Sequence, residues 1–223
     1  MEPDPAHEFL LPPSFYERDT VTVARELLGC VLVSTVGGET TRGRIVETEA
    51  YLGALDPGSH AATKGVTKRN AVMYGPAGHA YVYFTYGNHF MLNVVTEPEG
   101  AAGAVLLRAL EPLTGLDTMM RRRAVARRSA NPLLVRDIAN GPGKLTAALG
   151  IDLSLNGAPL DGSTGLSIFG PGARTAIAAS GRIGLSSGHE LELRFFLEGD
   201  ANVSRGHTGP RVASRAGRSR RGL

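Results

Sequence analysis

The spacing of apolar residues over the first fifty positions predicts one helix followed by two strands. Residues 20–30 carry apolar side chains at helical spacing and end at a glycine, so they predict a helix that stops there. Residues 30–36 are apolar and β-branched, which is typical of a strand, and a second strand is expected over residues 41–53. In this second strand, Ile45 and Val46 are predicted to belong to the core.

The remainder of the chain predicts more strands than helices. Residues 53–80 are rich in Gly, Pro, Asp, Thr and His and indicate a loop with at most a short helix. Two strands joined by a hairpin turn are expected next, with the turn near Gly87 and Asn88. Further strands are expected over 101–112, 165–169 and 190–199, and helices over 114–128 and 140–151.

These elements predict a single mixed α+β domain over residues 14–205, built on a curved, mainly antiparallel sheet with flanking helices. Residues 1–13 contain four prolines and are expected to form an extended arm. Residues 206–223 are basic and low in complexity, so a disordered tail is expected there.

Charge and composition give only weak evidence for a nucleic-acid partner. The 24 basic and 21 acidic residues leave a formal charge of +3, and such a small excess does not identify a partner. All but three of the basic residues are arginines, whose forked guanidinium suits phosphate oxygens, although a GC-rich coding sequence would produce the same bias. The basic stretch 121–128 is either a second phosphate-binding patch or a solvated helix face.

Other sequence features exclude several classes of protein. Cys30 is the single cysteine, so no disulfide forms within the chain, and no Cys/His set with zinc-ligand spacing is present. We therefore expect neither a metal nor a cofactor. Because the sequence has no basic and apolar leader and no run of 18 apolar residues, an intracellular, cytoplasmic protein without a signal peptide or membrane segment is expected.

Candidate catalytic residues first occur in the strand expected over 41–53. Alternation along a strand places Glu47, Glu49 and Tyr51 on one face. Three polar residues on one face are often simply exposed to solvent. If they are catalytic, spacing alone does not decide which of the two glutamates acts as the base.

The following loop and hairpin add basic and aromatic side chains. His60, Lys68 and Arg69 form a polar set that suits contact with phosphates or base edges. Tyr83 shares a strand face with its neighbour two residues earlier, and Tyr86 lies at the hairpin tip. Such rings often only stabilise a sheet through cross-strand contacts. They also offer flat faces on which a base stacks, each worth about 1–3 kcal/mol.

Several segments together closely resemble the alkyladenine DNA glycosylase family, also called animal-type 3-methyladenine DNA glycosylases. The resemblance extends over about residues 14–205 and is most specific between Arg44 and Pro112. It is carried by RIVETEAYLG, DPGSHAATKG, KRNAVMYGPAGHAYVYFTYGNHFMLNVVTE and GAVLLRALEP, and it continues in NGPGKLTAALGI.

The resemblance implies excision of alkylated or deaminated purines from double-stranded DNA, which leaves an abasic site. It implies that Glu49 is the general base, that Arg108 lies near this glutamate and its water, and that Tyr86 fills the gap left by the flipped nucleotide.

The resemblance also implies the binding contacts. Tyr51, Tyr83 and His60 are expected to enclose the base, and Asn93 to discriminate against the 2-amino group of guanine. Contacts to the DNA backbone are expected from Lys68, Arg69, Gly143 and Lys144.

No lysine lies at an evident nucleophile position, so a monofunctional enzyme without a lyase step is expected, acting as a monomer. Two other interpretations stay open. One is a nucleic-acid-binding domain that lacks turnover. The other is a small-molecule hydrolase that uses the same carboxylate, which would show no salt-dependent affinity for DNA.

Overall fold

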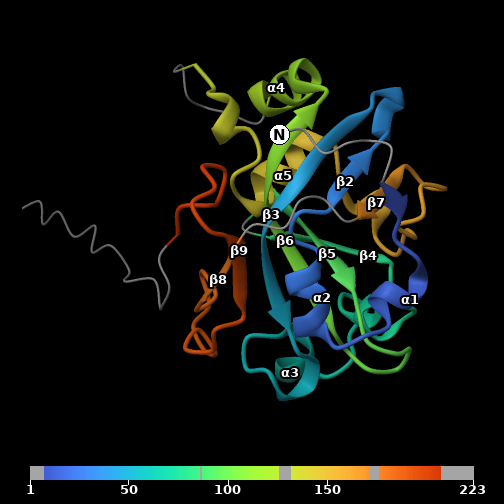
Figure 1. Ribbon diagram of the computed structural model, residues 1–223. Helices are drawn as coiled ribbons and strands as arrows, with labels where there is room; N and C mark the ends of the chain where they lie inside the picture. The colour runs from blue at the N-terminus through green and yellow to red at the C-terminus, as the bar shows by residue number, and fades with distance from the viewer. Residues whose placement is uncertain (1–7, 86, 126–131, 171–175, 207–223) are drawn as a thin grey trace, which may run out of the picture.

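The computed structural model describes residues 8–85, 87–125, 132–170 and 176–206. These residues form one mixed α+β domain, in which a curved antiparallel sheet is flanked by helices (Figure 1). The strands are β1 (Phe9–Leu10), β2 (Val31–Ser34), β3 (Thr41–Tyr51), β4 (Ala80–Thr85), β5 (His89–Val95), β6 (Ala104–Thr114), β7 (Leu166–Gly170), β8 (Ile177–Ser180) and β9 (Arg194–Leu197). The α-helices are α1 (Pro13–Tyr16), α2 (Thr20–Glu26), α3 (His60–Lys64), α4 (Leu116–Val125) and α5 (Pro142–Leu149). Short 3-10 helices are η2 (Val36–Gly38), η3 (Gly53–Leu55), η4 (Ala71–Tyr74), η5 (Val135–Asp137) and η6 (Leu153–Leu155).

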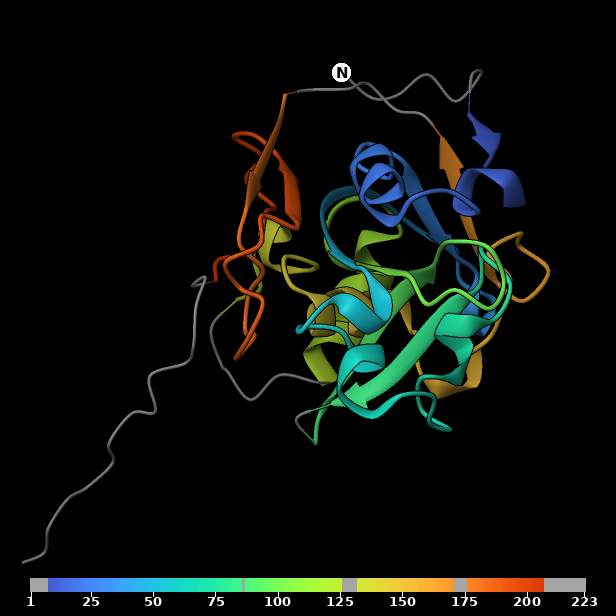
Figure 2. The ribbon, with the colours of Figure 1, turned by 90° about the horizontal axis from the view of Figure 1, so that it is seen from below.

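The sheet branches at β3. Its main path runs in the order β1-β7-β2-β3-β6-β5-β4. The first part of β3 pairs with β2, whereas residues 47–49 pair with β9, which in turn pairs with β8. β6 lies along the opposite edge of β3. Figure 2 shows the β8–β9 pair and the β1–β7 pair on opposite sides of the molecule, with the centre of the sheet between them.

Two bulges interrupt the pairing of β3 with β6 beside this branch. Val46 on β3 and Arg108 on β6 have no partner residue on the facing strand. A bulge bends its strand and redirects the side chains around it. This is why Ile45 and Val46 are both fully buried in the core although they are adjacent. It also places Arg108 where its side chain reaches both glutamates of β3.

Local signals define the two helices that pack on the sheet. The Asp19 side chain caps the N-terminus of α2, which contacts β3 and β6. Pro142 occupies the first turn of α5, and this helix ends at Gly150, whose left-handed φ of 72° an L side chain adopts only with strain. α5 contacts β5 and β6, so the core is enclosed between the sheet and these helices.

Most of the predicted elements are confirmed. The helix predicted over 20–30, the strands predicted over 30–36 and 41–53, and the hairpin are all present, although the second of these strands ends at Tyr51. Two short strands were not predicted: β1 lies inside the expected extended arm and pairs with β7, and β8 pairs with β9. The arm predicted over residues 1–13 extends one residue too far, since Pro13 already begins α1. Residues 1–7, 126–131 and 207–223, which belong to the predicted arm, basic stretch and tail, lie outside the described residues.

The described helices are all too short or too polar to cross a lipid bilayer.

Candidate active site

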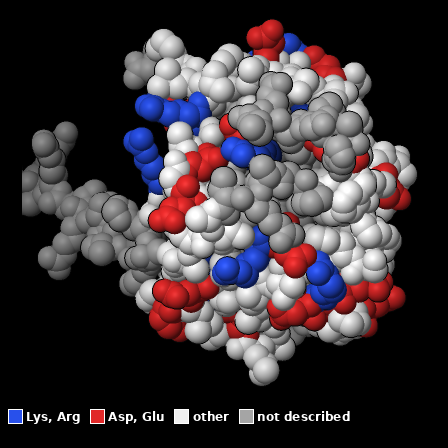
Figure 3. Space-filling view, viewed as in Figure 1, with Lys and Arg blue, Asp and Glu red and all other residues white. Residues whose placement is uncertain are grey.

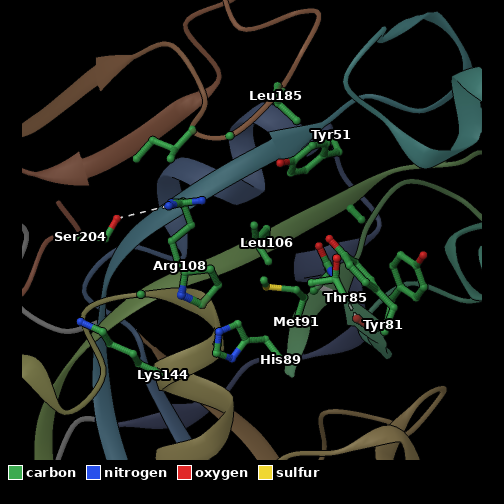
Figure 4. A pocket seen from close by; sticks show the side chains of 18 of the residues that line it. Tyr51, Tyr81, Thr85, His89, Met91, Leu106, Arg108, Lys144, Leu185 and Ser204 are labelled. Carbon is green, nitrogen blue, oxygen red and sulfur yellow. Dashed lines mark hydrogen bonds between the residues drawn. The ribbon is translucent and has the colours of Figure 1, made fainter. Parts of the chain in front are cut away.

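Most of the predicted site residues surround one cavity of about 660 Å³. Its walls come from β3, β4, β5 and β6, from the start of α5, and from the segments that follow β8 and β9, among other residues. In Figure 4, Tyr51 and Tyr81 lie on one side of the cavity, and Lys144 and Ser204 lie on the other. The predicted residues that line it are Tyr51, His60, Tyr83, Asn93, Arg108, Gly143 and Lys144.

Four predicted residues are not in this lining. Glu49 lies behind the wall, as described next. Lys68 and Arg69 are exposed in the loop after α3, outside the cavity. Tyr86, predicted to fill the gap in the duplex, lies outside the described residues.

Glu49 is fully buried and is held by three groups that themselves line the cavity. Its Oε1 accepts a hydrogen bond from the Ile183 backbone N–H at 2.8 Å and lies 3.2 Å from Nη1 of Arg108. Its Oε2 accepts the Tyr51 hydroxyl at 2.8 Å. Burial and the adjacent Glu49 charge raise the pKa of Tyr51 well above its ordinary value. The carboxylate is therefore turned toward the cavity and away from the apolar core.

Glu47 is also fully buried, but its oxygens hold other parts of the site together. Oε1 accepts from Arg108 Nε at 2.8 Å, from Arg194 Nε at 2.7 Å and from the Ser204 hydroxyl at 2.8 Å. Oε2 accepts the Ser204 N–H at 2.7 Å. Burial raises the pKa of Glu47, but the charges of Arg108 and Arg194 and these hydrogen bonds outweigh it and hold the pKa below its ordinary value.

Arg108 joins the two carboxylates. Burial lowers its pKa, but the charges of Glu49 and Glu47 outweigh this effect and raise the pKa above its ordinary value. Its Nη2 also contacts the Ser204 hydroxyl at 3.3 Å (Figure 4). Since Glu47 and Glu49 face Arg108 and Arg194, the cluster contains two carboxylates and two guanidinium groups. The buried charges are balanced.

The aromatic wall of the cavity is fixed by contacts among its own members. A hydrogen bond of 3.0 Å joins His60 Nδ1 to the Tyr81 hydroxyl. The His60 ring meets the Tyr83 ring at a centroid distance of 4.8 Å in an edge-on arrangement. Burial raises the pKa of Tyr81 to about 12, although the Arg69 charge lowers it. Asn93 is buried, and its Nδ2 donates to the Tyr81 carbonyl at 3.0 Å.

Positive charge is concentrated at the cavity. Of the described residues that line it, four are Arg or Lys and none is Asp or Glu, namely Arg108, Arg123, Lys144 and Arg205. Over the face shown in Figure 3, by contrast, basic and acidic side chains are interspersed. Since Arg108 is paired with Glu47 and Glu49 behind the wall, Arg123, Lys144 and Arg205 account for the positive character of the lining.

The start of α5 contributes backbone and a lysine to the opposite wall. Lys144 Nζ donates to Asn140 Oδ1 at 2.6 Å. A Cβ atom at Gly143 would lie 2.8 Å from the ring of His89, so glycine is required for this close approach. Lys144 thus lies in the same cavity as Tyr51, a placement that was not apparent from its position at a helix start.

Arg182 and Asp56 form a buried pair that the sequence did not single out. Arg182 is fully buried, and its Nη1 and Nη2 donate to the two carboxylate oxygens of Asp56 at 2.5 and 2.6 Å. Nη1 also donates to the carbonyl of Ala50. Because Ile183 directly follows Arg182 in the chain, this pair helps to position the Ile183 backbone N–H, which donates to Glu49.

The sequence analysis also missed Arg194 and Ser204, which hold Glu47. One signal was available for Arg194, since a charged residue that begins the otherwise apolar strand Arg194–Leu197 requires a partner where it is buried. Ser204 lies in irregular structure and has no comparable signal. Among the described residues, no group of three or more His, Cys, Asp or Glu side chains is arranged to hold a metal ion.

Comparison with known proteins bears on the chemistry of this cavity. The sequence profile of a family described as methylpurine-DNA glycosylase (MPG) matches residues 14–201. A protein of Methanoculleus marisnigri, provisionally named a 3-methyladenine DNA glycosylase, is 52% identical over 201 residues, which cover 87% of this chain and 98% of the relative. A protein of Carboxydothermus hydrogenoformans with the same provisional name is 48% identical, covering 88% of this chain and 99% of the relative.

Proposed function

The chain belongs to the methylpurine-DNA glycosylase family and is a DNA glycosylase, and we propose that it excises alkylated or deaminated purines that it flips out of double-stranded DNA. In this proposal, a water attacks the sugar C1′, the N-glycosidic bond breaks, and the base and an abasic site are released. No covalent intermediate with the enzyme forms, so the enzyme is monofunctional and lacks a lyase step.

The observation that carries this proposal is the position of Glu49. Every group that donates a hydrogen bond to Glu49 belongs to the cavity wall. Glu47, by contrast, also accepts from Arg194, which does not line the cavity. Glu49 acts as general base for the water, and its charge stabilises the positive charge that develops on the sugar. Because Glu49 has no exposed surface, Tyr51, Arg108 or Ile183 must shift to admit this water.

The aromatic wall supplies the binding energy for the flipped base. Tyr51, Tyr83 and His60 enclose the purine, and each stacked ring contributes about 1–3 kcal/mol. This offsets the few kcal/mol needed to unstack the nucleotide, a cost that is smaller for a damaged base. Since Tyr81 fixes the Asn93 amide, that amide does not yield to a bulky group, which supports discrimination against the 2-amino group of guanine.

The enzyme is tested on duplexes that contain a single hypoxanthine, with release of 3-methyladenine from methylated DNA as a second assay. Purified protein is expected to produce alkali-labile sites on the hypoxanthine duplex, and binding is expected to weaken steeply as salt rises. Persistent binding without alkali-labile sites would instead support a binding domain.

Borohydride treatment is expected to trap no protein–DNA adduct, and an adduct that disappears in Lys144→Ala would contradict the monofunctional mechanism.

Tyr86→Ala is expected to weaken binding to a lesion duplex by about tenfold, because the ring fills the space that the flipped nucleotide leaves. Fluorescence anisotropy with lesion and undamaged duplexes measures the effect, and the change should be confined to the lesion duplex. Phe84→Ala, two residues earlier at an exposed position, serves as the matched control. Unchanged lesion affinity in Tyr86→Ala would reduce this tyrosine to a packing role.

A further inference from the structure

Each of two cavity tyrosines, Tyr51 and Tyr83, carries a guanidinium group on one face of its ring. Arg182 Cζ lies 4.7 Å from the centroid of the Tyr51 ring, and Arg69 Cζ lies 4.8 Å from that of Tyr83. Both rings belong to the described residues that line the cavity, whereas neither arginine does. The guanidinium groups therefore lie against the ring faces that are turned away from the cavity.

The two arginines differ in how their charge is balanced. Arg182 is fully buried and donates to both carboxylate oxygens of Asp56, so its positive charge is balanced by the Asp56 carboxylate. Arg69 is exposed, and none of the salt bridges among the described residues involves it. Its Nη2 donates to the Phe84 carbonyl at 3.2 Å, and its guanidinium also interacts with the neutral Tyr81 side chain, whose pKa it lowers. Arg69 thus places an unbalanced positive charge behind Tyr83.

A cation is attracted to an aromatic face by the electron density of the ring. A guanidinium on the outer face draws on this same density, and its charge repels a second cation on the inner face. Purines alkylated on a ring nitrogen carry a positive charge, whereas hypoxanthine is neutral. The charge behind Tyr83 therefore affects these two kinds of base differently.

We propose that Arg69 is a specificity-determining residue that, through Tyr83, weakens binding of positively charged alkylated purines relative to neutral purines. The inference rests on the proposed function, because it requires the base to stack on Tyr83. It assigns Arg69 a role distinct from the backbone contact expected for it from the sequence. A phosphate contact would affect every lesion equally, whereas a charge behind the stacking ring changes the ratio between lesions.

The experiment compares kcat/KM for release of 3-methyladenine from methylated DNA with kcat/KM for a hypoxanthine duplex. Arg69→Gln is expected to raise the ratio of the first constant to the second by about two- to fivefold, the range for a cation near an exposed ring. Lys68→Gln is the matched control, since it removes the same charge one residue away. It is expected to lower both constants by the same factor.

The possible results separate the two proposals. If both constants of Arg69→Gln fall together, as in Lys68→Gln, or if the ratio falls, Arg69 does not determine specificity. If the wild-type protein excises neither base, the proposed function fails, and the inference about Arg69 fails with it. Because Arg69 is exposed, its variant is expected to melt at the wild-type temperature, which thermal unfolding verifies.

Discussion

Replacing Glu49 by glutamine is expected to lower the single-turnover rate of excision by about 10²–10⁴-fold while the lesion duplex is still bound. The amide cannot accept the proton of the attacking water. It does fit the site, since its oxygen keeps the Ile183 N–H and its nitrogen donates to the Tyr51 hydroxyl in place of accepting from it. Excision is measured as alkali-labile sites on a hypoxanthine duplex, and binding by fluorescence anisotropy.

The matched control is Glu26→Gln, the same substitution in an ion pair with Arg18 outside the cavity, which should leave excision unchanged. If Glu49→Gln still excises the base, another group must act as the general base. Glu47 is a poor alternative, because four hydrogen bonds already occupy its oxygens. Loss of both binding and excision, with a lower melting temperature, would mean that Glu49 is mainly structural.

The part of the site that lies on β3 was predictable from the sequence because strand alternation is a local signal. Three polar residues occupy alternate positions on this strand, namely Glu47, Glu49 and Tyr51, and in the structure both carboxylates contact Arg108 while Tyr51 donates to Glu49. The hairpin was equally predictable from its Gly-Asn turn. Which glutamate faces the cavity was not predictable, because both share that face and only their partners distinguish them.

Those partners come from segments that no local pattern connects to β3. Arg194 is 147 residues from Glu47, and Ser204 is 157 residues from it. They meet only because β9 pairs with residues 47–49, beyond the point where β2 leaves β3. The bulge at Arg108 likewise depends on the register of β3 with β6, which apolar spacing does not determine. Arg69 was recognised as basic, but its place behind Tyr83 depends on packing between a loop and a strand.

Replacing Glu47 by glutamine is expected to cost about 3–5 kcal/mol of unfolding free energy, because it leaves two buried guanidinium groups with one carboxylate between them. For a domain of this size, the melting temperature should fall by about 6–20 °C. Glu26→Gln is again the matched control, since the distance to its arginine, 2.8 Å, equals that between Glu47 and Arg108. The side chains of the Glu26 pair are about one third exposed to solvent, whereas Glu47 is fully buried, so loss of the Glu26 pair is expected to cost less than about 1 kcal/mol.

The difference in stability between the wild-type protein and Glu47→Gln is expected to depend on pH. The pKa of Glu47 is held below its ordinary value of 4.5 in the folded protein, so between the two pKa values the unfolded state binds more protons and stability rises with pH. The contribution of Glu47 is therefore complete above about pH 4.5 and is lost as the pH falls through the folded pKa. The stability gap between wild type and Glu47→Gln should shrink over that range, because the protonated side chain resembles the amide. Thermal unfolding of both proteins between pH 7 and pH 3 measures the gap, and a gap that is constant across this range would show that packing, not charge, accounts for the loss.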